Sequence, residues 1–411
     1  MEQTNKQAKE QITLEQAEDL ILAHTKAITD TEEIPLLQAS GRLLAEDMAA
    51  TFDNPSFDRS PIDGYACKAA DVANASREKP AQLKVTREID AGQYSTEEIQ
   101  KGQAVRIMTG AAIPPGCDCC IRQEDTDYGE EEVCIYRPEK TWGNYCFRGE
   151  DFKTGDVLLK KGTLLNFVEA GVLAGMGRTT VPVYRLPRAA VFTTGDEVIL
   201  PGEPLPPGKI YNSNQTLLAA RLLSLGVQLA YVSSIPDEPP AMAQALREAA
   251  PNVDVIFTTG AVSVGKKDIM HEALSLIQAE RVFWRVLVKP GMPTLFSTYQ
   301  GIPILSLSGN PFGVAVMAEL LARPMIQKMK QDDSLKLVRV QGTMHDSFEK
   351  PSKGRRFVRA YWDQAQGVFC LPSGLHSNGI LSSMAGCNCL IDIKAGSPAL
   401  QPGDAAEAIL L

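Results

Sequence analysis

Three apolar runs, each ending in glycine and polar residues, decide the fold: VIFTTGAVSVGKKD (255–268), VLVKPGMP (286–293) and ILSLSGNP (304–311). A short β-branched run that ends in this way is typical of a buried parallel strand that delivers its carboxyl end to a ligand crevice. Glycine lets an anion approach backbone N–H groups, and a helix that follows adds the positive end of its dipole. The three runs therefore predict phosphate-binding loops, to which Lys266 and Lys289 add positive charge.

Asp268 closes the first of these runs and has two interpretations. A carboxylate raises the electrostatic cost of an anion-binding crevice unless a divalent cation offsets it, so Asp268 is a candidate metal ligand. Alternatively, Asp268 is the first-turn acidic residue of the helix expected over 269–278, where it stabilises the helix dipole. The residue alone does not separate the two.

The segment 184–330 alternates strand-like with helix-like stretches. This alternation predicts a Rossmann-like, doubly wound α/β domain with an open parallel sheet. Within it, VFTTG (191–195) returns almost unchanged as IFTTG (256–260). We therefore expect two similar strand ends to lie side by side at one crevice.

Carboxylates follow three of the expected strands, at Glu197, Asp237 and Asp268. Because parallel strands end at the same edge of a sheet, we expect these acids at one rim, alongside Arg285 and Lys289. Repeated acid-and-glycine endings with a lysine suggest phosphate binding with a divalent cation such as Mg²⁺, and transfer or hydrolysis chemistry. Neither G-x-x-x-x-G-K-[ST] nor G-x-G-x-x-G occurs in the chain.

The flanking regions predict further domains. Short β-branched runs between turns, from about residue 82 to 156, indicate a small all-β domain, and the tail after residue 330 indicates a β barrel or sandwich. Two short apolar, glycine-containing segments frame the first β domain, which we interpret as an insertion into a connector. The expected division is an N-terminal helix (1–30), a connector (31–50 and 155–183), an inserted β domain (51–154), the α/β domain (184–330) and a C-terminal β barrel (331–411).

The inserted β domain carries three candidate site features. Asp63 precedes Gly64 in a turn that could aim its carboxylate outward, although Asp-Gly is also ordinary hairpin chemistry. Thr109 places a hydroxyl at a glycine turn. Arg148 lies three residues before Asp151, as either a ligand clamp or a surface salt bridge.

Composition excludes several classes of protein. A net charge of −9 argues against a general nucleic-acid or membrane binder. With no apolar signal region and no uninterrupted apolar stretch of about 18 residues, the sequence predicts a soluble, cytoplasmic protein. Nine cysteines, an odd number, favour reduced thiols. The clusters at 117–120 and 387–389 lack the paired spacing of a zinc site, so buried small residues are favoured over metal ligands.

The ordered motifs along the chain resemble those of the molybdopterin molybdenumtransferase family, which includes MoeA and the E domain of gephyrin. They are SPIDGYA (60–66), RIMTGAAIPPGCD (106–118), RGEDFKTGD (148–156), TTGDEV (193–198), IYNSN (210–214), TTGAVSVGKKD (258–268), VKPGMP (288–293) and SGNP (308–311). The resemblance implies Mg²⁺-dependent cleavage of adenylylated molybdopterin, insertion of molybdate and release of AMP. It also implies a homodimer with an active site shared between subunits, and a molybdopterin adenylyltransferase and molybdoenzyme acceptors as partners.

The resemblance also implies roles for individual residues. Asp237 and Asp268 would hold Mg²⁺, while Arg285 would attract molybdate, since a planar fork suits an oxyanion. Cleavage would then depend on positioning and charge neutralisation more than on a protein nucleophile. The implied catalytic residues are Asp63, Thr109, Asp151, Glu197, Asp237, Asp268, Arg285 and Lys289. The implied substrate-binding residues are Arg148, Gly260, Ser263, Gly265, Lys266, Gly309, Asn310 and Pro311.

The chain departs from the family pattern at Ala261, Ser308 and Gly313, where the family usually has glycine, proline and serine. Ala261 places a methyl group where we expect the backbone to need a positive φ angle, and Gly313 lacks a hydroxyl donor. A paralogue that handles tungstate, a non-catalytic pterin-binding scaffold and a nucleotide hydrolase therefore remain as alternatives.

Overall fold

The computed structural model describes residues 11–262, 269–374 and 377–411. Contacts divide the chain into two compact units, one of residues 33–183 and one that joins the N-terminal 32 residues to residues 184–411. Among the described residues, no helix has the length and apolar character needed to span a membrane.

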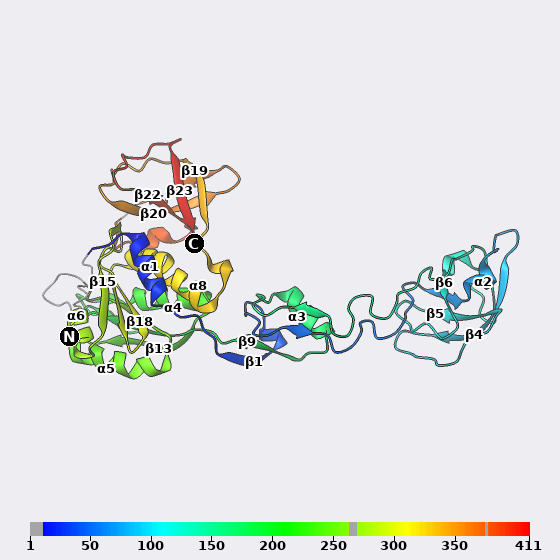
Figure 1. Cartoon of the computed structure of the whole chain (residues 1–411). Coiled ribbons are helices and arrows are strands. Elements are labelled where there is room, and N and C mark those ends of the chain that lie inside the picture. Colours follow the sequence, from blue (N-terminus) through cyan, green and yellow to red (C-terminus); the bar gives the residue numbers. More distant parts are fainter. Residues whose placement is uncertain (1–10, 263–268, 375–376) are drawn as a thin grey trace, which may run out of the picture. The chain divides into compact units, whose positions relative to one another are not determined.

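A six-stranded mixed sheet forms the centre of the larger unit (Figure 1). Its first four strands are parallel, whereas the last two are antiparallel, so the expectation of a wholly parallel sheet is wrong at one edge. Gln300 and Gly301 both have positive φ angles, which is the requirement of a two-residue hairpin turn, and they return the chain between the fourth and fifth strands. In spatial order the strands are β13 (Gln228–Ile235), β10 (Arg188–Thr194), β14 (Val255–Thr259), β18 (Ile302–Leu307), β17 (Leu295–Tyr299) and β15 (Glu280–Trp284).

Helices cover both faces of this sheet, as the doubly wound pattern predicts. Neighbouring residues of one strand enter opposite cores: Val191 packs with α1, α4, α7 and α8, while Phe192 packs with α5 and α6. This alternation explains why β10 is buried at every position after Arg188. The helices are α1 (Leu14–Ala23), α4 (Ser213–Ser224), α5 (Pro239–Ala249), α6 (Ile269–Leu276), α7 (Pro311–Met317) and α8 (Arg323–Lys330), with a π-helical segment (Ala318–Ala322) joining the last two.

Side chains at the helix ends fix where two of these helices begin. Thr13 and Gln16 form a reciprocal capping box at the start of α1. Asn212 caps α4, since its side chain accepts the N–H of Gln215 at 3.1 Å. Asn212 directly follows β12 (Ile210–Tyr211), which forms a short ladder with β11 (Val198–Ile199). The cap therefore joins this ladder to the first turn of α4.

The C-terminal region closes into a five-stranded barrel, as the β-rich tail predicts. The run VLVKPG does not end in the α/β sheet as expected, because its strand β16 (Val288–Lys289) pairs with the barrel instead. The barrel strands, in order around the ring, are β20 (Arg355–Asp363), β21 (Val368–Cys370), β19 (Arg339–Met344), β23 (Ala405–Leu410) and β22 (Cys389–Ile393).

The smaller unit contains a connector and a β domain. In the connector, β1 (Thr31–Pro35) pairs with β9 (Thr180–Tyr184) and β2 (Met48–Ala49) pairs with β8 (Val157–Leu159), while α3 (Phe167–Gly175) packs beside them. The chain between these two halves forms a five-stranded sheet. Its elements are β6 (Cys119–Arg122), β3 (Gly64–Cys67), β5 (Gln103–Ile107), β4 (Ala81–Ile89), β7 (Glu132–Ile135) and the short helix α2 (Ala69–Val72).

Candidate functional site

A crevice of about 460 Å³ opens at the carboxyl ends of the four parallel strands. β10 lies between β13 and β14, and the helices that follow β10 and β14 pack on opposite faces of the sheet. This is a topological switch point, where open α/β sheets bind their ligands. Six of the predicted site residues line the crevice: Glu197, Asp237, Gly260, Gly309, Asn310 and Pro311. Four other predicted residues, Ser263, Gly265, Lys266 and Asp268, lie outside the described residues.

Asp237 is fixed in the crevice by β10, the strand beside its own. One carboxylate oxygen accepts a short hydrogen bond from the Thr194 hydroxyl, and the other accepts the N–H of Asp196 at 3.3 Å. Because β10 and β13 are parallel neighbours, this geometry follows from the strand register. Asp237 is therefore held as a hydrogen-bonded carboxylate.

Gly260 brings β14 unusually close to β10. Its φ angle is +97°, and a Cβ atom placed on it would lie 2.3 Å from the carbonyl oxygen of Thr194. Only glycine fits both conditions. Ala261 follows with φ +48°, so this chain does place a methyl group on a left-handed backbone, as the sequence suggested.

The first turn of α4 faces the crevice. Asn212, Ser213 and Asn214 all line it, so the positive end of the helix dipole lies at the crevice, where it would favour an anion. Asn214 donates to Thr259 Oγ1 at 3.1 Å and to the carbonyl of Gly309 at 2.8 Å. These bonds tie the loops after β14 and β18 together. The remaining Asn214 oxygen is buried and has no partner among the described residues.

The described lining of the crevice is acidic, since its only charged side chains are Glu197 and Asp237. Two carboxylates and the unpartnered amide oxygen of Asn214 are hard oxygen donors of the kind that Mg²⁺ prefers. The residues therefore fit a divalent cation. Such a cation would offset the repulsion between these acids and a phosphorylated ligand.

Lys289 lies elsewhere than expected. It does not line the described part of the crevice but a groove of about 330 Å³, together with Lys353, Arg355 and Arg356. We call these four residues the basic groove. Arg355 is bound to Asp392 at 2.7 Å, whereas the Nε of Arg356 is buried without a described partner.

Arg359 is the functional candidate that the sequence reasoning missed. It lines a small hollow next to the basic groove, shared with Lys289 and Arg356, and is only 1% exposed. Its guanidinium stacks 3.6 Å from the ring centroid of Phe312 and donates to Ser383 Oγ at 2.7 Å and to backbone carbonyls. No acidic residue lines the groove or the hollow in the described parts of the chain. Three cations therefore meet without a carboxylate, which is the electrostatic requirement of an oxyanion site.

Two of the departures from the family pattern compensate for each other. A Cβ atom on Gly313 would lie 2.8 Å from the Ser308 hydroxyl, so the missing side chain at 313 leaves the room that Ser308 occupies. The Ser308 hydroxyl is buried and has no partner among the described residues. A hydroxyl donor thus remains at this point, supplied by the residue directly after β18 instead of by α7.

Arg285 is not among the residues that line the crevice or the basic groove. Its guanidinium stacks on Trp284, 4.2 Å from the ring centroid, and its φ angle is +67°. Trp284 in turn contacts the edge of His271 on α6. The described contacts of Arg285 are therefore those of a stacked side chain beside α6.

The smaller unit holds its predicted residues in two hydrogen-bonded groups. Asp63 accepts both the N–H and the hydroxyl of Thr109 at 2.7 Å, and these bonds hold the pKa of Asp63 below its ordinary value. Asp151 accepts from Asn54 at 2.8 Å. Arg148 pairs with Asp53 at 2.7 Å rather than with the nearby acids of its own loop.

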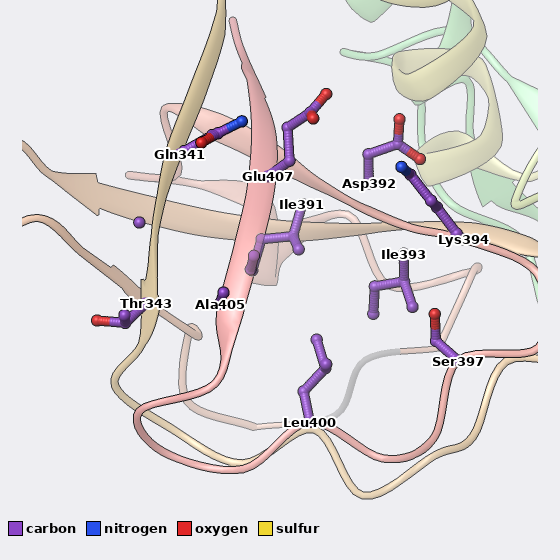
Figure 2. A pocket seen from close by; sticks show the side chains of 12 residues that line it. Gln341, Thr343, Ile391, Asp392, Ile393, Lys394, Ser397, Leu400, Ala405 and Glu407 are labelled. Atoms are coloured by element: carbon purple, nitrogen blue, oxygen red, sulfur yellow. The ribbon is translucent and has the colours of Figure 1, made fainter.

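A cavity in the barrel is a different kind of site. It has a volume of about 590 Å³. Figure 2 shows side chains that line it, among them the apolar Ile391 and Leu400 and the acids Asp392 and Glu407. Both acids are already paired with Arg339, and the Asp392 bond measures 3.0 Å. Because Arg339 offsets their charges, these two acids act as structural ion-pair partners of the barrel.

The cysteines behave as buried thiols where the sequence favoured that interpretation. Cys117, Cys119 and Cys120 are buried, and burial raises the pKa of Cys120 to about 12. Cys389 is also buried, and Cys387 is half-buried. All nine thiols are free.

Taken together, the fold and crevice define a class of protein: a multi-domain α/β protein with a ligand-sized crevice at a topological switch point and a separate basic groove. Comparison with family models is more specific. Residues 12–177 match the MoeA N-terminal region (domains I and II), residues 190–328 a probable molybdopterin binding domain, and residues 341–411 the MoeA C-terminal region (domain IV).

Known relatives extend over the whole chain. The molybdopterin molybdenumtransferase of Bacillus subtilis (strain 168) is 35% identical across 95% of this chain and 92% of its own length. That of Staphylococcus aureus (strain COL) is 34% identical across 92% and 90%. The molybdopterin biosynthesis MoeA protein of Pyrococcus horikoshii OT3 superposes with a TM-score of 0.78 at 28% identity, over 98% of this chain and all of that one. The chain belongs to the molybdopterin molybdenumtransferase family.

Proposed function

We propose that this protein is a molybdopterin molybdenumtransferase that cleaves adenylylated molybdopterin, inserts molybdate into the dithiolene and releases AMP. The observation that carries the proposal is the crevice, in which the acids Glu197 and Asp237 meet the glycine-opened ends of parallel strands at the start of α4. Curated relatives that share about a third of their residues with the chain bear the name of this activity.

The phosphoanhydride of the substrate would lie across the crevice. The first N–H groups of α4 and the close approach at Gly260 suit phosphate oxygens, and the partly exposed Ile210 and Tyr211 offer a wall for a heteroaromatic ring. Asp237, with Asp268 from outside the described residues, would hold Mg²⁺. When bound there, the cation supplies charge neutralisation for the pyrophosphate.

Positioning is the main contribution of the protein to cleavage. Thr194 and the N–H of Asp196 orient the carboxylate of Asp237, and Asn214 fixes the loops on either side. Water attacks a phosphorus atom of the anhydride, the P–O bond breaks and AMP leaves. No described side chain needs to act as a covalent nucleophile, so the rate enhancement depends on orientation and preorganised charge.

Molybdate would enter through the basic groove. Lys289, Arg356 and Arg359 provide positive charge around one hollow, and the unpartnered Nε of Arg356 is a buried donor for an oxyanion. This arrangement makes the groove a better molybdate site than Arg285, which is stacked on Trp284. The proposal therefore transfers the role first assigned to Arg285 to these three residues.

Self-association would use the connector. α3 is almost entirely apolar, yet its Phe167 is 85% exposed and its Val168 is 52% exposed. Leu37, elsewhere in the connector, is fully exposed. Exposed apolar clusters of this kind mark interfaces, and a second copy of the chain suits the homodimer that the family resemblance implies. Phe167→Asp should shift the protein toward monomer in light scattering after gel filtration. A mass unchanged from that of a wild-type dimer would remove this face from the interface.

Incubation with adenylylated molybdopterin, Mg²⁺ and either molybdate or tungstate tests the proposal. Release of AMP with formation of metal-bound pterin supports the transferase, and the more effective oxyanion identifies the metal. Binding without AMP release indicates a scaffold. AMP release without metal insertion indicates a nucleotide hydrolase.

A further inference from the structure

A second group of potential metal ligands lies on the C-terminal barrel, where β19 and β21 are parallel neighbours. The pairing continues beyond β19, since the N–H of His345 donates to the carbonyl of Phe369 at 2.9 Å. Asp346 is bound to the same strand end, because its Oδ2 accepts the N–H of Leu371 at 2.8 Å. These backbone contacts hold the side chains of His345 and Asp346 next to Cys370.

The potential ligand atoms are already close together. His345 Nδ1 lies 3.1 Å from Asp346 Oδ1, and one ligand atom from each of His345, Asp346 and Cys370 lies within 4.8 Å of the others. In a tetrahedral zinc site with bonds of about 2.0–2.3 Å, ligand atoms are roughly 3.3–3.8 Å apart. Small side-chain rotations would therefore bring these three atoms to coordinating distance.

We propose that His345, Asp346 and Cys370 form a Zn²⁺ site with three protein ligands and an open fourth position for water. A thiolate with an imidazole selects a borderline-soft transition metal over Mg²⁺. The backbone N–H of Leu371 donates to Oδ2 of Asp346 and so fixes the carboxylate, while Oδ1 remains available to the metal. Hydrogen bonds to the non-coordinating atom of a metal ligand commonly orient it in this way. His345 is exposed and Cys370 is only half-buried, so a cation can enter from solvent. The site does not depend on the proposed transferase activity.

Cobalt is the probe that reads this site directly, since Co²⁺ replaces Zn²⁺ and absorbs light. The full chain, without a histidine tag, reduced and stripped of metal with a chelator, would be titrated with Co²⁺. We expect one equivalent to produce the visible bands of a tetrahedral complex and a near-ultraviolet thiolate-to-cobalt band. Zn²⁺ should then displace Co²⁺ and remove both.

Matched variants locate the site. Cys370→Ser should abolish the thiolate band, and His345→Asn should weaken binding at least as much as the roughly 10–100-fold typical of lost outer partners. Cys134→Ser is the control, because Cys134 is also partly exposed and lies beside an aspartate, Asp127. Among the described residues, however, Cys134 belongs to no group of three potential metal ligands. This variant should bind like the wild type. Absence of a stoichiometric thiolate band in the wild type, or its survival in Cys370→Ser, overturns the proposal.

Discussion

Replacing Gly260 by alanine should disturb the crevice more than any other single methyl group, because two separate penalties combine there. The residue has φ +97°, which an L-residue adopts at about 1–2 kcal/mol. The added Cβ would also lie 2.3 Å from the carbonyl oxygen of Thr194, and overpacking of this kind costs about 1–3 kcal/mol. We expect a loss of about 2–5 kcal/mol in the free energy of unfolding.

Gly301→Ala is the matched control for this measurement. Gly301 lies in the same sheet with φ +82° and no atom within 4 Å of its added Cβ, so it suffers only the backbone penalty of about 1–2 kcal/mol. Urea unfolding of both variants gives the difference, and AMP release shows whether the displaced Thr194 also disturbs Asp237. Equal losses of stability in the two variants would refute the inferred contact between β14 and β10.

Three further predictions follow from the remaining contacts. Gly313→Ala should destabilise the wild type, because the new methyl group clashes with the Ser308 hydroxyl. In a Ser308→Ala background that clash is absent, and the helix propensity of alanine should make Gly313→Ala stabilising by up to about 1 kcal/mol. If urea unfolding showed that the effects of the two substitutions simply add, the coupling would be contradicted. Arg359→Lys should raise the Kd for molybdate about 10- to 150-fold, the equivalent of about 1.5–3 kcal/mol for a charged hydrogen bond; calorimetry measures it, and an unchanged Kd excludes Arg359 from the site. Thr109→Val should raise the pKa of Asp63 toward its ordinary 3.8, because it removes one of the two hydrogen bonds to the carboxylate. During acidification, the stabilisation that ionised Asp63 gives the folded state should then be lost at a higher pH than in the wild type. NMR titration of the Asp63 carboxyl group measures the pKa change.

The sequence predicted the crevice well because its determinants are local. Every one of these strand ends carries a glycine or an acid in its own local sequence, and parallel pairing then brings Glu197, Asp237 and Gly260 to one edge. The repeated TTG endings predicted that the ends of β10 and β14 lie together, and the alternation of strands and helices added Asp237 to the same edge.

The basic groove was not predictable in the same way. Lys289 leaves the α/β sheet because β16 pairs with Arg355 and Arg356 of β20, a long-range choice that no local pattern reveals. Arg359 did leave a signal, as a charged residue within the otherwise apolar stretch FVRAY (357–361). The sequence analysis did not predict the antiparallel edge of the sheet, although Gln300 and Gly301 form an ordinary hairpin turn. The apolar runs before and after this turn have the composition of parallel strands, so they gave no sign of the change in direction.

The most direct test of the account is AMP release from adenylylated molybdopterin by Asp237→Asn in the presence of Mg²⁺. Asparagine keeps the size of the side chain and can still accept from Thr194, so the substitution removes mainly the negative charge. The account predicts a fall in rate of at least about 100-fold, comparable to the loss of one preorganised electrostatic group in other enzymes. A rate equal to that of the wild type would contradict the assignment of the crevice as the site of cleavage.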